Sequence, residues 1–123
     1  MQKPLYIVWG KVEAGKKRGR ALGFPTANIK LHKNIPEGIY AAKVKVDKID
    51  FLAATFVGKA KTFQETKSKI EPFLLEFNGN LYGKWITITL FKKIRDNMKF
   101  ASEKELSRQM GKDVEDVKHF FTS

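Results

Sequence analysis

The sequence predicts a mainly β protein, an antiparallel sandwich or barrel that ends in helical structure. Several short segments alternate apolar and polar residues, which is the period of a half-buried strand. These segments follow one another closely, with turn-forming residues between them, and this favours antiparallel pairing. Helical spacing occurs only near the C-terminus. With 123 residues, the chain is long enough for one hydrophobic core, and we expect a single domain over residues 1–123.

The clearest strand prediction covers residues 39–46. Its apolar face comprises Tyr40, Ala42, Val44 and Val46, and its other face carries lysines. Residues 47–50 predict a turn, and residues 51–57 predict the returning strand.

Residues 73–77 and 85–91 predict a second strand pair. The segment Asn78-Gly79-Asn80 lies between them, and Asn-Gly is a strong hairpin signal. We therefore expect these two segments to pair with each other. The longest loops are expected at 10–38 and 58–70.

The C-terminal segment predicts helices. Ser102 and Glu105 have the spacing of a capping box, which marks a helix start. Gly111 is expected to end this helix, and Asp113 to cap a second short one.

The composition indicates a basic protein without disulfides, whose charge serves either solubility or the binding of anions. Lys and Arg number 24 against 13 Asp and Glu, a net charge of +11, which attracts phosphates, nucleic acids or anionic lipids. No apolar run is long enough to span a membrane, and no signal peptide is expected. The absence of cysteine excludes disulfides and fits a reducing, cytoplasmic location, which we expect.

The segment 10–28 combines glycines and cations with two neutral oxygen ligands. Four glycines and five cations precede Pro25, and glycines let backbone N–H groups approach phosphate closely. Thr26 and Asn28 are two residues apart, so in an extended chain both side chains point the same way. Neutral oxygens suffice for Mg²⁺ when a nucleotide supplies the charge. A self-capped β-turn explains the same residues, and no Walker or Rossmann glycine motif is present.

Four sequence blocks resemble the ATP-dependent riboflavin kinase family. They are "GKVEAGKKRGRALGFPTANIKL" (10–31), "EGIYAAKVKV" (37–46), "IEPFLLEFNGNLYGKWITITLFKKIR" (70–95) and "FASEKELSRQMGKD" (100–113). Their order and spacing match the kinase half of bifunctional bacterial enzymes that make flavin mononucleotide (FMN) and FAD. The resemblance implies a six-stranded antiparallel Greek-key barrel with a C-terminal α-helix. Because the chain lacks an adenylyltransferase half, we expect no FAD synthesis.

The resemblance also implies site residues. Mg²⁺ and the nucleotide phosphates are expected at Thr26 and Asn28. The loop that packs against ATP is expected to include Gly10, Lys16, Ala21, Leu22 and Gly23. The flavin side is expected to involve Arg95, Asn97 and Phe100, with the loop after Arg95 closing over the flavin.

The family's catalytic carboxylate corresponds to Glu71. As a general base, Glu71 would accept the proton of the ribityl 5′-hydroxyl. Glu76 is the alternative, which we expect on the same strand but on the opposite face.

Two positions depart from the family pattern, and both are expected beside the substrate cleft. Lys61 replaces a proline, and Phe73 stands where a histidine is frequent.

Two other functions stay open at this point. Small basic barrels with exposed aromatic residues bind single-stranded nucleic acid, and a relative could bind flavin without catalysis. We expect a monomer whose partners are riboflavin or FMN and ATP or ADP, rather than nucleic acid.

Overall fold

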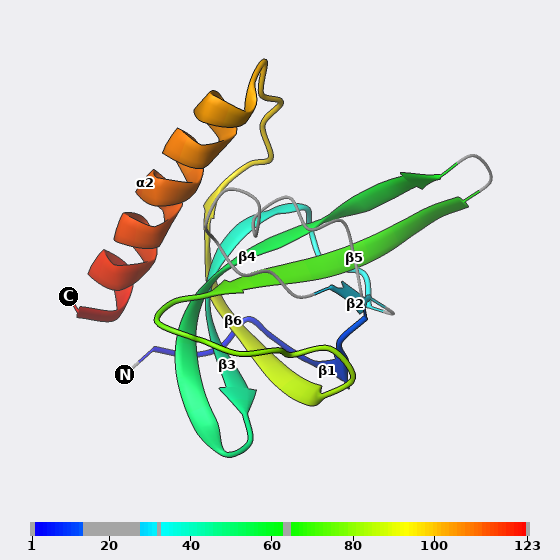
Figure 1. Cartoon of the computed structure of the whole chain (residues 1–123), viewed down its shortest axis with the longest axis vertical. Coiled ribbons are helices and arrows are strands. Elements are labelled where there is room, and N and C mark those ends of the chain that lie inside the picture. Colours follow the sequence, from blue (N-terminus) through cyan, green and yellow to red (C-terminus); the bar gives the residue numbers. More distant parts are fainter. Residues whose placement is uncertain (1, 14–27, 32, 63–64, 123) are drawn as a thin grey trace.

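In the computed structural model, the described residues form six strands of one antiparallel sheet that curls into a nearly closed barrel, and the C-terminal helix lies on its outside (Figure 1). The structure describes residues 2–13, 28–31, 33–62 and 65–122. The elements are β1 (Tyr6–Lys11), β2 (Ile29–Lys30), β3 (Gly38–Val46), β4 (Ile49–Thr62), β5 (Glu65–Leu74), β6 (Trp85–Arg95) and α2 (Glu103–Thr122). None of the described helical structure is long and apolar enough to cross a membrane.

The strand order is β1-β6-β3-β4-β5-β2. Three consecutive strands, β3 to β5, lie side by side, and β6 returns to pair with β3, which is the Greek-key arrangement. The two ends of the sheet meet where the Glu13 N–H donates to the Asn28 carbonyl at 2.8 Å. The predicted mainly β barrel with a C-terminal helix is confirmed.

Alternation along the strands divides the side chains between the barrel interior and an outer layer. The predicted apolar face of β3, Tyr40, Ala42, Val44 and Val46, lies in the interior core. Asp47 and Lys48 join β3 to β4 with φ values of 48° and 72°, as a two-residue hairpin turn requires. The turn is therefore shorter than the predicted 47–50, and β4 begins at Ile49.

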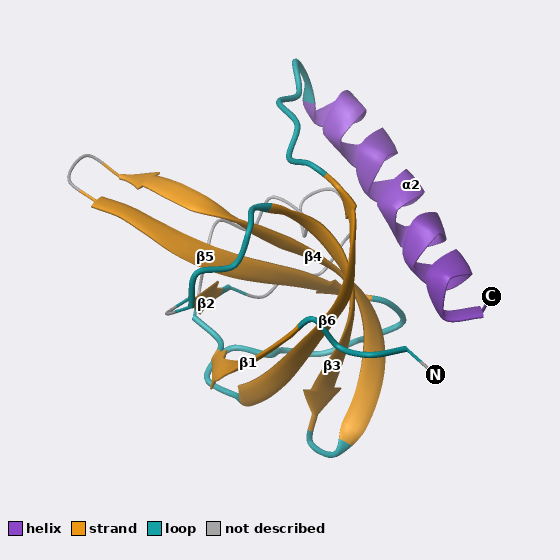
Figure 2. Ribbon diagram, turned by 180° about the vertical axis from the view of Figure 1, so that it is seen from behind, coloured by secondary structure: helices purple, strands orange, loops and turns teal. Residues whose placement is uncertain are grey.

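The outer layer lies between the sheet and α2 (Figure 2). Its buried residues are Ala41, Ala54, Phe73, Met110 and Val117. Phe73, one of the two departures from the family pattern, therefore packs in the layer that holds the helix on the sheet, with 9% of its surface exposed.

The predicted pairing of 73–77 with 85–91 is wrong. β5 pairs with β4 and β2, whereas β6 pairs with β1 and β3. The Asn78-Gly79-Asn80 segment is an exposed connection, not a tight hairpin. Forming the barrel gives β3, β4, β5 and β6 two strand partners each and buries the inner face of the sheet, which outweighs one local turn signal.

Two other boundary predictions are also wrong. Much of the expected loop 58–70 belongs to β4 and β5, because backbone pairing continues past their apolar segments. The helix begins at the predicted capping box, where the Glu105 N–H donates to Ser102 Oγ at 3.2 Å. However, α2 continues through Gly111 as one helix, because Asp113 lies on the same buried face as Met110 and Val117 and caps nothing.

We expect Gly10→Ala to destabilise the fold. A Cβ atom on Gly10 would lie 2.7 Å from Ile29 Cγ2, where β1 approaches β2. Overpacking of this kind costs about 1–3 kcal/mol in the free energy of unfolding, measurable by chemical denaturation. Gly111→Ala is the control, since no atom lies within 4 Å of its added Cβ, and it should stabilise the helix by about 0.5–1 kcal/mol. Equal effects of the two changes would contradict this packing argument.

Candidate functional site

The pairing of β2 with β5 brings two predicted site residues together. Ile29 pairs with Ile70, and both side chains lie in the barrel interior. The next residues, Asn28 and Glu71, therefore belong to the outer face, and continuing the register by one residue sets them opposite each other. The sequence offered no means of bringing these residues together except the family resemblance.

Glu71 occupies a sheltered position on this outer face. Its side chain is 15% exposed, and its Oε1 lies 3.5 Å from the Lys69 ammonium. Lys69 in turn lies over the ring of Phe56, 5.9 Å from the ring centre, and Phe56 is the β4 partner of Glu71. The carboxylate therefore has a neighbouring cation on one side and an aromatic ring across the strand.

Asn28 carries an uncommon feature. Its Oδ1 atom is buried and accepts no hydrogen bond. Leaving a buried polar atom without a partner costs about 1–3 kcal/mol, and a bound water or ion can satisfy such an atom. Thr55 Oγ1 has the same feature. The described residues include no cluster of three or more His, Cys, Asp or Glu. A site that uses neutral oxygens and leaves the remaining positions to phosphates and water fits Mg²⁺.

The segment after β6 lies against β4 beside these residues. The Asn97 side-chain amide donates to the Val57 carbonyl at 3.1 Å, one residue from Phe56. Phe100, farther along the segment, is partly buried. Two of the predicted flavin-side residues therefore lie on a segment that is attached to the wall of the candidate site.

Close packing shapes the same part of β4. A Cβ atom on Gly58 would lie only 2.3 Å from the Phe56 ring, so this ring covers Gly58. Only glycine at position 58 leaves room for the Phe56 ring, which lies along the outer face of the strand.

Arg95 joins the end of β6 to the middle of α2. Its Nε and Nη2 atoms donate to the two carboxylate oxygens of Asp113, each at 2.7 Å, and Nη1 donates to the Asp96 carbonyl at 2.9 Å. Gln109 donates a further hydrogen bond to Asp113 at 3.1 Å. The Asp113 side chain is 1% exposed. This buried ion pair fixes the point at which the segment after β6 leaves the sheet.

This role of Asp113 differs from the predicted helix cap. A usable signal existed, since Asp113 falls at helical spacing between Met110 and Val117. A charge on the buried stripe of a helix predicts a buried partner.

A surface ion pair lies at the start of the same segment. The hydrogen bond to Asp96 raises the pKa of Lys93, and the same hydrogen bond lowers the pKa of Asp96. Both groups are exposed, so this pair contributes little to stability.

Several predicted ATP-site residues lie outside the described residues. They are Lys16, Ala21, Leu22, Gly23 and Thr26. Gly10 is described, and it lies in the barrel wall against Ile29.

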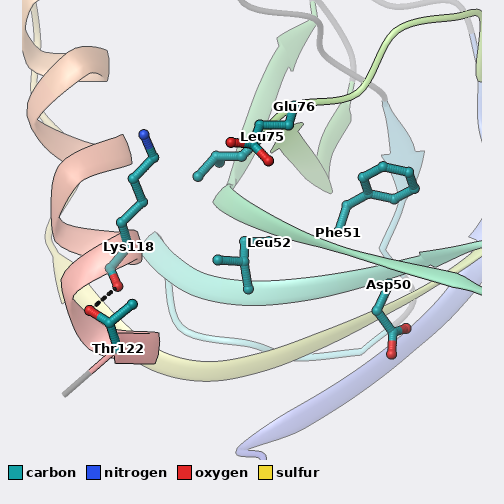
Figure 3. Close-up of a pocket in the computed structure, with 7 residues that line it drawn as sticks. All are labelled: Asp50, Phe51, Leu52, Leu75, Glu76, Lys118 and Thr122. Atoms are coloured by element: carbon teal, nitrogen blue, oxygen red, sulfur yellow. Dashed lines mark hydrogen bonds between the residues drawn. The ribbon is translucent and has the colours of Figure 1, made fainter.

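A groove of about 540 Å³ lies elsewhere, between the start of β4, the end of β5 and the last turns of α2 (Figure 3). It is lined by Asp50, Phe51, Leu52, Leu75, Glu76, Lys118 and Thr122. Glu71 and Asn28 do not line it. Glu76 lines it. The expectation that Glu76 shares a strand with Glu71 is wrong. β5 ends at Leu74, and Glu76 sits in a turn with a φ of 58°.

Comparison with known proteins identifies the family. A family model described as riboflavin kinase matches residues 2–121. The chain belongs to the riboflavin kinase family.

Two bacterial relatives of this family are both described as bifunctional riboflavin kinase/FMN adenylyltransferase. The protein from Haemophilus influenzae is 39% identical over 121 residues, which cover 96% of this chain and 39% of the relative. The protein from Bacillus subtilis is 37% identical over 124 residues, with 96% and 39% covered. The chain thus spans about two-fifths of the length of these relatives.

Two solved structures share the fold. A riboflavin kinase from Trypanosoma brucei superposes with a TM-score of 0.67 at 24% identity, over 100% of this chain and 82% of that one. A structure described as a macrolide-efflux protein from Streptococcus pneumoniae superposes with a TM-score of 0.84 at 33% identity, over 94% of this chain and 38% of that one. Both share the barrel fold of this chain, and we take the fold alone from them.

We expect Asp113→Asn to lower the free energy of unfolding by about 3–5 kcal/mol, because it leaves the Arg95 guanidinium without its buried counter-charge. Thermal or chemical denaturation measures this loss. Glu115→Gln is the control on the same helix, since its partner Lys118 lies 4.0 Å away and the Glu115 side chain is 76% exposed. If both variants lose less than about 1 kcal/mol, the value expected for a surface pair, the ion pair does not have this role.

Proposed function

We propose that the chain is a kinase that transfers the γ-phosphoryl group of ATP to the 5′-hydroxyl of riboflavin, making FMN and ADP. The observation that supports this proposal is the β2–β5 register in a member of the riboflavin kinase family, since continuing it by one residue puts Asn28 opposite Glu71. A carboxylate and a neutral oxygen on one face are groups that such a transfer can use.

In the proposed reaction, Glu71 acts as general base. It accepts the proton of the ribityl hydroxyl as the hydroxyl oxygen forms a bond to the γ-phosphorus. The bond between that phosphorus and the bridging oxygen of ADP breaks, and ADP leaves with the electron pair. The sheltered position of Glu71 supports this role, since a base must be held within reach of the hydroxyl and kept from bulk water.

The nucleotide phosphates are proposed to lie next to Asn28. Asn28 Oδ1, together with Thr26, would hold Mg²⁺, which neutralises phosphate charge when bound. Lys69 lies beside Glu71, and Lys30 is the partner of Lys69 across the β2–β5 pair. Two cations therefore lie near the position proposed for the phosphates. The net charge of +11 favours capture of an anionic nucleotide.

The flavin is proposed to lie along the segment that follows β6. Asn97 and Phe100 belong to this segment, and the Asn97 contact with β4 brings it toward Phe56. Aromatic and apolar surface of this kind suits an uncharged flavin ring. Because its guanidinium already binds Asp113, we assign Arg95 to positioning the segment.

The direct test is incubation with riboflavin, ATP and Mg²⁺, followed by chromatography. We expect FMN and ADP in equal amounts. Riboflavin binding without any FMN would favour a non-catalytic flavin-binding relative instead.

We expect Glu71→Gln to lower kcat by about 10²–10⁴-fold, the usual contribution of a positioned base, because glutamine keeps the shape but cannot take the proton. The KM values should change little. Glu76→Gln, on an exposed turn away from the site, should retain activity. Glu13→Gln is a nearer control, since Glu13 pairs with Asn28 and its carboxylate is half exposed. If Glu13→Gln or Glu76→Gln is as inactive as Glu71→Gln, the assignment of the base is wrong.

We expect Asn28→Ala to raise the Mg²⁺ concentration needed for half-maximal activity by roughly 10–100-fold, the effect seen when groups around a metal site are removed. Its free energy of unfolding should stay the same or rise, because the substitution deletes a buried oxygen that has no hydrogen-bond partner. Asn78→Ala, in an exposed loop, is the control. Unchanged Mg²⁺ dependence combined with lost stability would make Asn28 a structural residue.

A further inference from the structure

Two tryptophans stack on the outside of the barrel, exposed to solvent. Trp9 of β1 and Trp85 of β6 have ring centres 4.5 Å apart and planes inclined by 24°. Their exposed fractions are 67% and 55%. Burial of an indole is strongly favourable, so two adjacent exposed indoles indicate a surface that binds something flat and apolar.

Cations flank the indoles on both sides. In the β1–β6 pair, Trp9 lies opposite Thr87 and Lys11 lies opposite Trp85. In the next strand, β3, Lys45 lies opposite Thr87. We call Trp9, Trp85, Lys11 and Lys45 the tryptophan platform. By strand register, it combines two stacked indoles with one lysine on β1 and one on β3.

The charge of this surface selects the kind of partner. Within the described part of the chain, neither Lys11 nor Lys45 has an ion-pair partner. With a net charge of +11, a second copy would be repelled. The partner must therefore carry negative charge together with flat apolar groups.

We propose that the tryptophan platform binds single-stranded nucleic acid. Exposed bases would stack on the indoles, and backbone phosphates would contact Lys11 and Lys45, which is the combination that sequence-independent single-strand binding uses. The platform lies on the β1–β6–β3 part of the wall, whereas the candidate kinase site lies on β2, β5 and β4 (Figure 2). The two activities should therefore be separable.

The chain itself supplies the probe. Trp9 and Trp85 are the only tryptophans in the sequence, so intrinsic fluorescence reports on the platform alone. We expect titration with a single-stranded oligothymidylate of about 10 nucleotides to quench this fluorescence, with an affinity that falls as salt rises. Trp9→Ala should weaken binding by roughly 5- to 100-fold, with Trp85 remaining as reporter.

Matched controls separate stacking from charge. Ile49→Ala removes another exposed apolar residue, 59% exposed, which lies at the β3–β4 turn and outside the indole pair, and it should leave binding unchanged. An abasic oligonucleotide of the same length, and polyglutamate, carry the charge without the bases and should bind far more weakly. Circular dichroism checks that Trp9→Ala folds, and Trp9→Phe, which keeps a stacking ring, should retain much of the affinity.

The proposal is overturned if oligothymidylate causes no quenching, or if the abasic oligonucleotide or polyglutamate binds equally well. Equal binding would indicate a general anionic partner such as an acidic protein surface. An unchanged affinity in Trp9→Ala would also overturn it. None of these outcomes depends on kinase activity, so they leave the proposed function untouched.

Discussion

The closure of the barrel between its first and second strands is the constraint on which the site depends. The backbone hydrogen bond from Glu13 to Asn28 joins the two edges of the sheet, and Gly10 allows β1 to approach Ile29. Because Ile29 then faces the interior, its neighbour Asn28 must face outward, beside Glu71. The buried Asn28 oxygen without a hydrogen-bond partner is thus a consequence of how the sheet closes, and we propose that a bound ligand satisfies it.

The ion pair between Arg95 and Asp113 positions the segment after β6, on the other side of the site. It joins the end of β6 to a long helix at a point where the carboxylate is fully enclosed. The chain between these two anchors must then cross the outside of β4, where Asn97 holds it to Val57. The Arg95–Asp113 ion pair thus positions one wall of the proposed flavin site without contacting the flavin. The closure of the barrel positions the other wall.

Local patterns predicted much of the fold, and long-range packing explains the failures. The alternation of 39–46 and the capping box at Ser102 depend on nearby residues and were correct. The pairing of β5 and the continuity of α2 through Gly111 depend on partners distant in the sequence, and the predictions for both were wrong. The same holds for the site, because only the family resemblance connected Asn28 with Glu71. Nothing local indicated that Trp9 and Trp85 stack, since register alone brings them together.

We propose that the nucleotide–metal complex binds at Asn28 on the outer face of β2 and β5. Nuclear magnetic resonance with Mn²⁺ and ADP tests it directly, because a paramagnetic ion broadens the signals of the nuclei nearest to it. Our account predicts that the side-chain amide of Asn28 broadens strongly and only when ADP is present, while the exposed Asn78 amide keeps its signal. Broadening centred on the groove at Lys118 and Thr122, with the Asn28 signal intact, would contradict it.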